Sequence, residues 1–471
     1  MPHKYIKKKN FLLLCGLLLF FTACTLDTQD SQGSYLIVEE LGGESTPLIR
    51  LYQADLASND LQLLIEFDAQ NEYWLSPNGQ YLALLHLHND NDLRERNLEI
   101  IQLDNKETIG QISEVGYLYP NNFHVHIGPN SVLWSPSNDK ILFERNSVDD
   151  EGNVLWVYDL ETNSEVQLTS GKRLERNPAW SNNSQDISFV STECVQNSNT
   201  CNQLDAVWDI FTVNIQNQST QLLADFPNKF TSFEPGTGDG FFCNLLWSPD
   251  NQFIAFENEC LNSGSILENH RVFNINVENG MIEEALKFEQ PFAYRFSYDW
   301  LDEDNLLISY SKADYLNLQS FIKGGIKSFE PHKGIQSENV ELLGFRGNEL
   351  QLSPNNTKFI VFTKEPFFDS SEVGQLFTSG STLLGNYIKG DMTISSESNL
   401  LPNGLCSKNT AIWSPDGRYV AYSSIGKQHA CIEDKNATNV YVYSTENKQS
   451  VNLTDSLKGV VTPVGWLTIQ N

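Results

Sequence analysis

The sequence predicts an all-β protein in which four-stranded antiparallel blades form a closed ring, the arrangement called a β-propeller. Three observations support this prediction. A motif of the type Trp-Ser-Pro-Asp-Gly recurs along the chain, a short β-rich segment follows each copy, and the segments between copies lack the 3.6-residue apolar period of a helix. Of the 471 residues 40% are hydrophobic, so the chain has enough apolar side chains for a large core.

The motif marks the start of each repeat unit. Its copies begin at Leu75, Trp134, Trp180, Trp247, Trp300, Leu352 and Trp413, with Trp466 as an eighth anchor, at spacings of 46 to 67 residues. Proline fixes φ early in a turn, Asp or Asn hydrogen-bonds to the nearby backbone, and glycine accepts a positive φ. Each copy therefore predicts a tight hairpin whose tryptophan ends the first strand of its unit.

Four strands are predicted in each unit. The second strand follows the motif directly, at 81–85, 141–144, 187–190, 253–257, 306–310, 359–363 and 419–423. A further pair follows in most units, for example 154–159 with 166–169, and it is weakest in the units that begin at Trp300 and Leu352. Four antiparallel strands repeated at this period are typical of propeller blades.

The two ends of the chain are predicted to complete one blade together. The C-terminal unit contains a single strand, 462–469, and the N-terminal region supplies three more, at 35–40, 48–52 and 61–67. Pairing them closes the ring and removes open sheet edges that favour aggregation. We expect eight blades, and seven is the alternative.

The clearest motif region, Trp413-Ser414-Pro415-Asp416-Gly417-Arg418-Tyr419-Val420-Ala421-Tyr422, resembles the WD40-like repeats of TolB-type propellers. The resemblance covers residues from about 35 to the C-terminus and implies a fold rather than an activity, because these residues shape turns and cores. TolB itself carries an α/β domain before its propeller, which has no counterpart here. A Gly-x-Ser-x-Gly nucleophile motif is also missing from the sequence, which argues against a propeller-bearing serine peptidase.

The N-terminal residues predict export. Lys4 and Lys7–Lys9 precede an apolar run at 11–21, which is too short to span a bilayer, and the run ends in Phe21-Thr22-Ala23-Cys24. This ending resembles the lipobox of bacterial lipoproteins, which implies acylation of Cys24; an ordinary cleaved signal is the alternative. We expect a signal peptide at 1–23, a lipid-anchored linker at 24–34 and the propeller at 35–471, located in the cell envelope outside the cytoplasm, at the outer membrane, in the periplasm or on the cell surface.

The charge of the chain disfavours nucleic acid as a partner. The formal net charge is −29, and it becomes −33 once the four lysines of the signal are removed. Nucleic-acid binding needs a basic surface to neutralise phosphates. An acidic surface also repels anionic lipid headgroups. We therefore expect the protein to contact a membrane through the acyl chains of the anchor alone.

Six cysteines remain after Cys15 of the signal and Cys24 of the anchor. In an oxidising compartment they predict three disulfides, Cys194–Cys201, Cys243–Cys260 and Cys406–Cys431, because the second and third pairs flank one hairpin each. Metal ligation is the alternative, although Cys-x-x-Cys spacing is absent from the sequence.

Two His-x-His pairs are the clearest candidates for a functional site. His86 with His88, and His124 with His126, are predicted on neighbouring blades at the end of the ring opposite the motif turns, and Asp90 and Asp92 follow the first pair. Residues i and i+2 of a strand share a face, so each pair could offer two imidazoles to a divalent metal. The alternative is that these histidines are ordinary strand and loop residues.

The sequence favours a non-catalytic scaffold that binds a protein, peptide or glycan partner, because no catalytic set of residues is recognisable in it. In this reading the protein has no cofactor. The alternative is a metal-dependent polysaccharide lyase or hydrolase, since propellers similar to the TolB type occur among pectin-degrading lyases with a histidine-bound metal. That alternative would use the His pairs as metal ligands.

Overall fold

The structure is a computed structural model. It describes residues 34–42, 47–86, 96–116, 132–146, 153–170, 173–193, 208–224, 243–257, 271–286, 292–314, 317–331, 333–343, 347–363, 366–367, 376–377, 382–388, 391–394, 411–424 and 439–468. Within these ranges the secondary structure consists of strands and turns. The described residues form no helix that is long and apolar enough to cross a bilayer.

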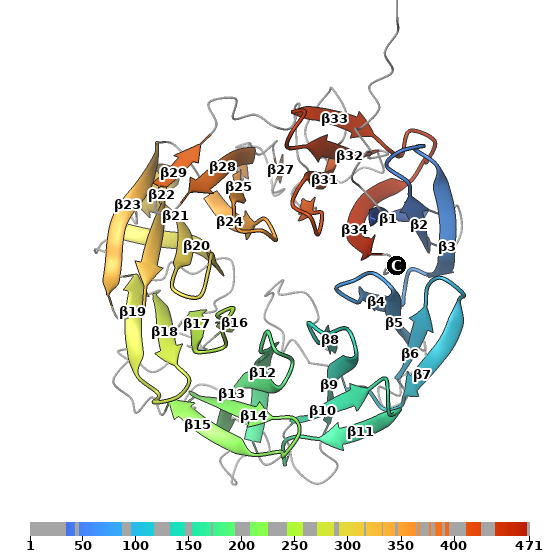
Figure 1. Ribbon diagram of the computed structural model, residues 1–471, viewed down its shortest axis with the longest axis horizontal. Coiled ribbons are helices and arrows are strands. Elements are labelled where there is room, and N and C mark those ends of the chain that lie inside the picture. The colour runs from blue at the N-terminus through green and yellow to red at the C-terminus, as the bar shows by residue number, and fades with distance from the viewer. Residues whose placement is uncertain are drawn as a thin grey trace, which may run out of the picture.

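Eight four-stranded antiparallel sheets, numbered here as blades, surround a common axis (Figure 1). From the axis outward, blade 1 consists of β34 (Val460–Thr468), β1 (Ser34–Gly42), β2 (Leu48–Ala54) and β3 (Leu61–Asp68). Blade 2 consists of β4 (Glu72–Leu75), β5 (Tyr81–His86), β6 (Asn97–Gln102) and β7 (Glu107–Ile112). Blade 3 consists of β8 (Val132–Trp134), β9 (Lys140–Asn146), β10 (Asn153–Asp159) and β11 (Ser164–Gln167).

The next blades follow around the ring in chain order. Blade 4 consists of β12 (Arg173–Trp180), β13 (Asp186–Glu193), β14 (Trp208–Asn214) and β15 (Thr220–Ala224). Blade 5 consists of β16 (Cys243–Trp247), β17 (Phe253–Glu257), β18 (Val272–Asn276) and β19 (Ile282–Leu286). Blade 6 consists of β20 (Phe292–Trp300), β21 (Leu306–Asp314), β22 (Asn317–Glu330) and β23 (Gly334–Leu343).

The last two blades lead back to blade 1. Blade 7 consists of β24 (Gly347–Leu352), β25 (Lys358–Thr363), β28 (Thr382–Ile388) and β29 (Asp391–Ile394). Blade 8 consists of β30 (Ile412–Trp413), β31 (Tyr419–Ser424), β32 (Asn439–Ser444) and β33 (Gln449–Asn452). A two-stranded pair, β26 (Pro366–Phe367) and β27 (Leu376–Phe377), separates β25 from β28 in the chain. The eight sheets agree with the ring size favoured by the sequence, and the second pairs of blades 6 and 7 are present.

The serine of the motif closes each hairpin. In blade 5 the Ser248 hydroxyl donates to Asp250 at 2.6 Å and accepts the Phe253 N–H at 2.9 Å. The same bond, to the N–H five residues later, recurs at Ser76, Ser135, Ser181, Ser353 and Ser414. The residue three positions after the serine has a positive φ of 53° to 69° in Gly79, Asn138, Ser184, Asn251, Asn356 and Gly417. The turn therefore requires the Gly or Asn that the motif usually supplies at this position.

Strands from the two ends of the chain close the ring. β34 pairs with β1 from Thr468 opposite Ser34 to Val460 opposite Leu41. The buried Glu40 carboxylate holds the start of β34, since it accepts the N–H groups of Lys458 at 3.3 Å and Gly459 at 3.2 Å. Closure by both termini within one blade, as predicted from the sequence, is confirmed.

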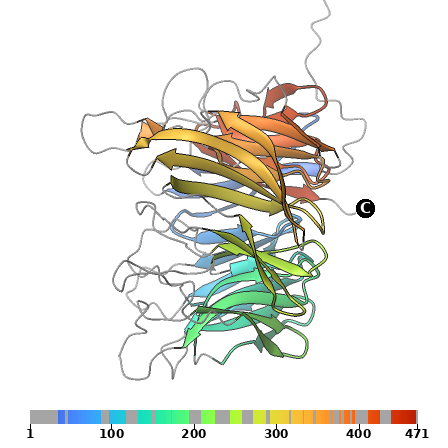
Figure 2. The ribbon, with the colours of Figure 1, turned by 90° about the vertical axis from the view of Figure 1, so that its left-hand side faces the viewer.

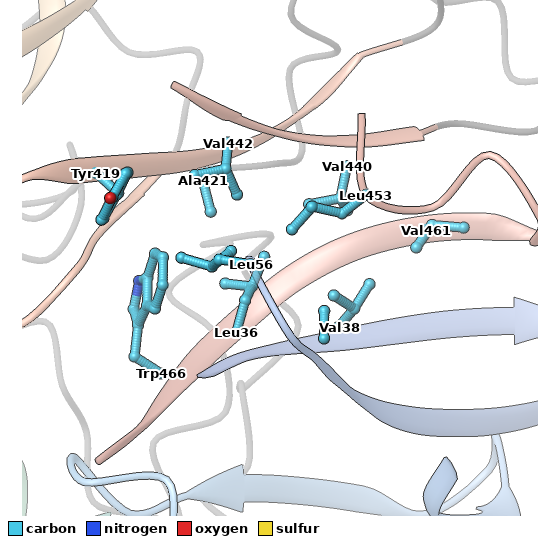
Figure 3. Close-up of a cluster of buried hydrophobic side chains, with 11 residues drawn as sticks. Leu36, Val38, Leu56, Tyr419, Ala421, Val440, Val442, Leu453, Val461 and Trp466 are labelled. Atoms are coloured by element: carbon cyan, nitrogen blue, oxygen red, sulfur yellow. The ribbon is translucent and has the colours of Figure 1, made fainter. Parts of the chain in front are cut away.

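The hydrophobic core lies between neighbouring blades. Figure 3 shows one such cluster, in which β1 and β34 of blade 1 pack against β31 and β32 of blade 8. A strand such as β17 is buried along its whole length because blades cover both of its faces. Each large apolar side chain removed from water contributes about 1.5–3 kcal/mol, so stability depends on contact around the whole ring.

Candidate functional site

The two ends of the ring differ in the connections that they carry. At one end, the turn end, lie the motif turns and the turns between third and fourth strands, such as 248–252 and 277–281. The other end, the loop-bearing end, receives the connections that follow each second strand and those that join blades, such as 194–207 and 225–242. Strands cross the thickness of the ring between these ends (Figure 2). The long insertions thus attach where the sequence predicted.

Of the predicted metal ligands, the structure describes His86. It is the last residue of β5, at the loop-bearing end, and its Nε2 lies 3.0 Å from Glu99 Oε2 on β6. Burial raises the pKa of Glu99, but hydrogen bonds from Thr108 and His86 outweigh this effect and hold the pKa below its ordinary value. His86 is therefore engaged with a carboxylate of its own blade.

The other predicted ligands, His88, Asp90, Asp92, His124 and His126, lie outside the described residues. In the part of the chain that is described, no three His, Cys, Asp or Glu side chains gather closely enough to hold a metal ion. The metal site stays a prediction.

The predicted cysteine bridges are also untested. Cys243 opens β16 and lies opposite Glu257 in the register. The remaining cysteines, Cys194, Cys201, Cys260, Cys406, Cys431 and the predicted anchor Cys24, lie outside the described residues, as does the predicted signal peptide.

A buried polar cluster occupies the interface between blades 3 and 4 at the loop-bearing end. Arg173 and Glu175 stand near the start of β12, and Glu175 pairs in register with Ser191 of β13. Arg173 donates to Ser191 Oγ at 2.8 Å and to Asp209 Oδ2 at 2.9 Å, and its guanidinium carbon lies 4.9 Å from the centroid of the Phe211 ring. The arginine is thus fixed by partners on two strands of its own blade.

Glu175 is the most perturbed acid of this cluster. It is 3% exposed, and among the residues that the structure describes its Oε2 atom has no hydrogen-bond partner. Burial raises the pKa of Glu175 to about 8, although its own backbone N–H, Arg173 and the Thr169 hydroxyl favour the ionised form. A neutral carboxylic acid is therefore the main form at pH 7.

Blade 3 contributes a second acid to this interface. Glu144, 2% exposed, lies near the end of β9 opposite Leu155, and it shares a face with Leu142. Leu142 and Leu155 both pack against β13 of blade 4. Glu144 and Glu175 thus belong to the same end of one interface, with Asp209 as the third carboxyl.

The sequence contains a signal for part of this cluster outside the Trp-Ser-Pro-Asp-Gly motif itself. Glu144 and Glu257 each stand nine residues after a motif serine and directly follow an apolar run, in Ile-Leu-Phe-Glu and Phe-Ile-Ala-Phe-Glu. Both are buried, and Asn244 donates to Glu257 at 2.7 Å. An acid in a row of core residues is a sign of a buried polar contact. Glu175 gave no such sign, because its strand begins with mixed polar residues.

The comparisons with known proteins address the fold. No protein-family model matches the chain, and no curated protein matches it in sequence. A solved structure of a eukaryotic initiation factor is 12% identical, with a TM-score of 0.53 over 93% of this chain and 99% of that one. An oligogalacturonate lyase in complex with manganese is 10% identical, with a TM-score of 0.50 over 88% of this chain and 97% of that one.

TolB from Acinetobacter baumannii is also similar, with 12% identity over 92% of this chain and 82% of that one and a TM-score of 0.35. At such low identities the first two likenesses speak for architecture alone. Together with the eight described sheets, they show that the chain is a β-propeller, as its TolB-type motifs predicted.

Proposed function

We propose that the protein is an exported, lipid-anchored propeller that binds a protein, peptide or glycan partner at its loop-bearing end. The observation that carries this proposal is the difference between the two ends of the ring. Short hydrogen-bonded turns cover the turn end, whereas the long connections attach at the other end. A rigid scaffold that presents long connections on one side is a common design for recognition.

The N-terminal sequence supports the anchored part of the proposal. The basic residues before 11–21 and the Ala23-Cys24 junction match a lipoprotein signal, and β1 begins ten residues after Cys24. The anchor would then attach close to the blade that closes the ring. Replacing Cys24 with Ala is expected to move the protein from the membrane fraction to the soluble fraction; retention of the variant in the membrane would contradict acylation at this residue.

The binding part is tested with a trimmed variant. Connections 194–207 and 225–242 are replaced by short Gly-Ser linkers, and chemical cross-linking in envelope extracts is followed by a direct affinity measurement with the purified partner. We expect the trimmed variant to lose the partner. A control that alters exposed turn-end side chains, Glu161→Ala with Gln185→Ala and Gln216→Ala, should keep it. Equal capture by the intact and trimmed proteins would argue against binding at this end.

A further inference from the structure

The interface between blades 3 and 4 changes character along its length. Toward the turn end it is apolar, with Leu142 and Val157 of blade 3 against Ile187 and Phe189 of blade 4. At the loop-bearing end the polar cluster of Glu144, Glu175, Asp209 and Arg173 replaces this contact. The blades thus pack through apolar side chains at one end, and polar and charged side chains lie between them at the other end.

The charges of the cluster are unbalanced. The charged groups of the cluster beside Glu175 are Arg173 on its own strand, Asp209 on β14 and Glu144 on β9, while β13 contributes the neutral Ser191. Arg173 is already engaged with Asp209 at 2.9 Å. A negative charge on the buried Glu175 would therefore be offset by Arg173 alone, and the Arg173 guanidinium already pairs with Asp209.

The described part of the chain offers few hydrogen-bond donors to an ionised Glu175. An ionised carboxylate can accept about four hydrogen bonds, whereas Glu175 Oε2 has no partner within the described residues. The Thr169 hydroxyl bonds to the Glu175 carboxyl and accepts the Leu155 N–H at 3.0 Å, so it links β12 to β10 of the neighbouring blade. The neutral acid fits this environment better than its anion does.

We propose that the interface between blades 3 and 4 is a pH-sensitive joint, in which ionisation of the buried Glu175 carboxyl weakens the contact between the blades at the loop-bearing end. The raised pKa of Glu175 determines how the contact between the blades changes with pH. A carboxyl whose pKa is higher in the folded than in the unfolded state stabilises the fold below its unfolded value, and this contribution is lost as the pH rises to about 8. The joint thus closes in neutral or acidic solution and loosens above it, whether or not this end binds a partner.

Hydrogen–deuterium exchange tests the joint directly. Amide protection in β10 and β12 is compared at pH 6.5 and pH 9, after correction for the intrinsic exchange rate. We expect the wild-type protein to lose roughly tenfold more protection there than the Glu175→Gln variant, which stays neutral at both pH values. Strands of blade 8 serve as the internal reference, and Glu161→Gln, an exposed change at the turn end of blade 3, should behave like the wild type.

If the glutamine variant does not fold, infrared spectroscopy of the wild-type protein measures the protonation of Glu175 instead. The wild-type protein should show a protonated carboxyl band at pH 7 that disappears by pH 9.5, and a folded Glu175→Gln variant should lack this band at pH 7. The proposal fails if no carboxyl band of the wild type titrates in this range. It also fails if the variant and the wild type lose protection equally in β10 and β12.

Discussion

At the scale of single residues, the motif tryptophan has a second task besides filling the core. In four copies of the motif, its indole N–H donates to the blade before it: Trp180 donates to Leu133 O at 3.1 Å, and Trp300 donates to Leu246 O at 3.0 Å. Trp134 and Trp247 make the same contact. These bonds join successive blades from blade 2 to blade 6 at the inner strands.

Other groups join the blades whose motif lacks a tryptophan. In blade 7, where Leu352 takes this position, the Leu350 N–H donates to Ser297 Oγ at 3.2 Å, and the Leu352 N–H bonds to the Asp299 carboxylate. In blade 2, where Leu75 takes it, Gln80 Nε2 donates to Thr468 O at 3.0 Å. A polar contact between neighbouring blades is therefore kept where the tryptophan is absent.

We predict that the indole hydrogen bond can be measured by comparing two tryptophans of similar burial. Trp300 is 4% exposed and Trp466 is 5% exposed, but within the described residues Trp466 Nε1 has no hydrogen-bond partner. Trp300→Phe should lower the free energy of unfolding by about 1–2 kcal/mol more than Trp466→Phe, because only the first change removes a hydrogen bond and takes its donor from the Leu246 carbonyl. Denaturant unfolding of both variants measures this difference, and equal losses would show that ring volume alone matters.

At the scale of the hairpin, the motif turn of blade 2 also packs against the strand that closes the ring. Gly79 and Gly417 occupy the same motif position, and both have a φ of 69°. A Cβ atom on Gly79 would overlap the carbonyl oxygen of Trp466 in β34, whereas one on Gly417 would lie 3.0 Å from the flexible side chain of Asn355. The turn of blade 2 thus fits against the backbone of the closing blade, and the turn of blade 8 does not have this constraint.

This difference predicts unequal costs for the same substitution. Gly417→Ala should destabilise the protein by roughly 1 kcal/mol, the cost of a left-handed backbone for alanine. Gly79→Ala should cost about 3 kcal/mol or more, because a backbone carbonyl must also move. Thermal unfolding of the two variants under the same conditions measures the difference. Similar melting temperatures would mean that the backbone of β34 shifts at little cost to make room for the added methyl group.

The strands were predictable from the sequence where turn chemistry and apolar pattern agree. The prediction of 253–257 coincides with β17, and the four strands of blade 1 were found from both ends of the chain. The outer strands of blade 6 were not clear, because β22 contains Gly324 and Gly325 within a long strand, and glycine weakens the β signal.

The candidate site was predictable only in part, because its contacts depend on strand register and on how blades pack. Motif spacing placed His86 at the loop-bearing end, but its partner Glu99 stands 13 residues further along the chain, and the register of β5 with β6 brings the two side chains together. The cluster around Glu175 depends on how two blades meet. Such contacts between blades follow from register and packing, and a single sequence does not encode them as a local pattern.

At the scale of the whole molecule, stability depends on the completeness of the ring. Each apolar cluster is shared by two blades, so a missing strand weakens two interfaces at once. β34 is the inner strand of blade 1, and Val461 and Trp466 from it enter the cluster shared with blade 8. On its other face, Val464 and Leu467 pack toward blade 2.

Removing residues 460–471 is therefore expected to abolish cooperative folding. The deletion takes Val461 and Trp466 out of a buried cluster, at about 3–5 kcal/mol for a large core side chain, and it leaves the backbone groups of β1 without partners along one edge. Since a typical domain has a total stability of about 5–15 kcal/mol, these losses together should exceed what the ring can tolerate.

Circular dichroism melting and size-exclusion chromatography report the outcome. The truncated chain should aggregate or melt without a sharp transition, whereas a control that lacks only residues 469–471 keeps every described pairing of β34 with β1 and should melt like the parent. A cooperative transition of the longer truncation at the parent's temperature would mean that seven blades and three strands form a stable unit on their own. In that case closure by β34 would contribute little, and the network around Glu40 would not be needed to hold the ring.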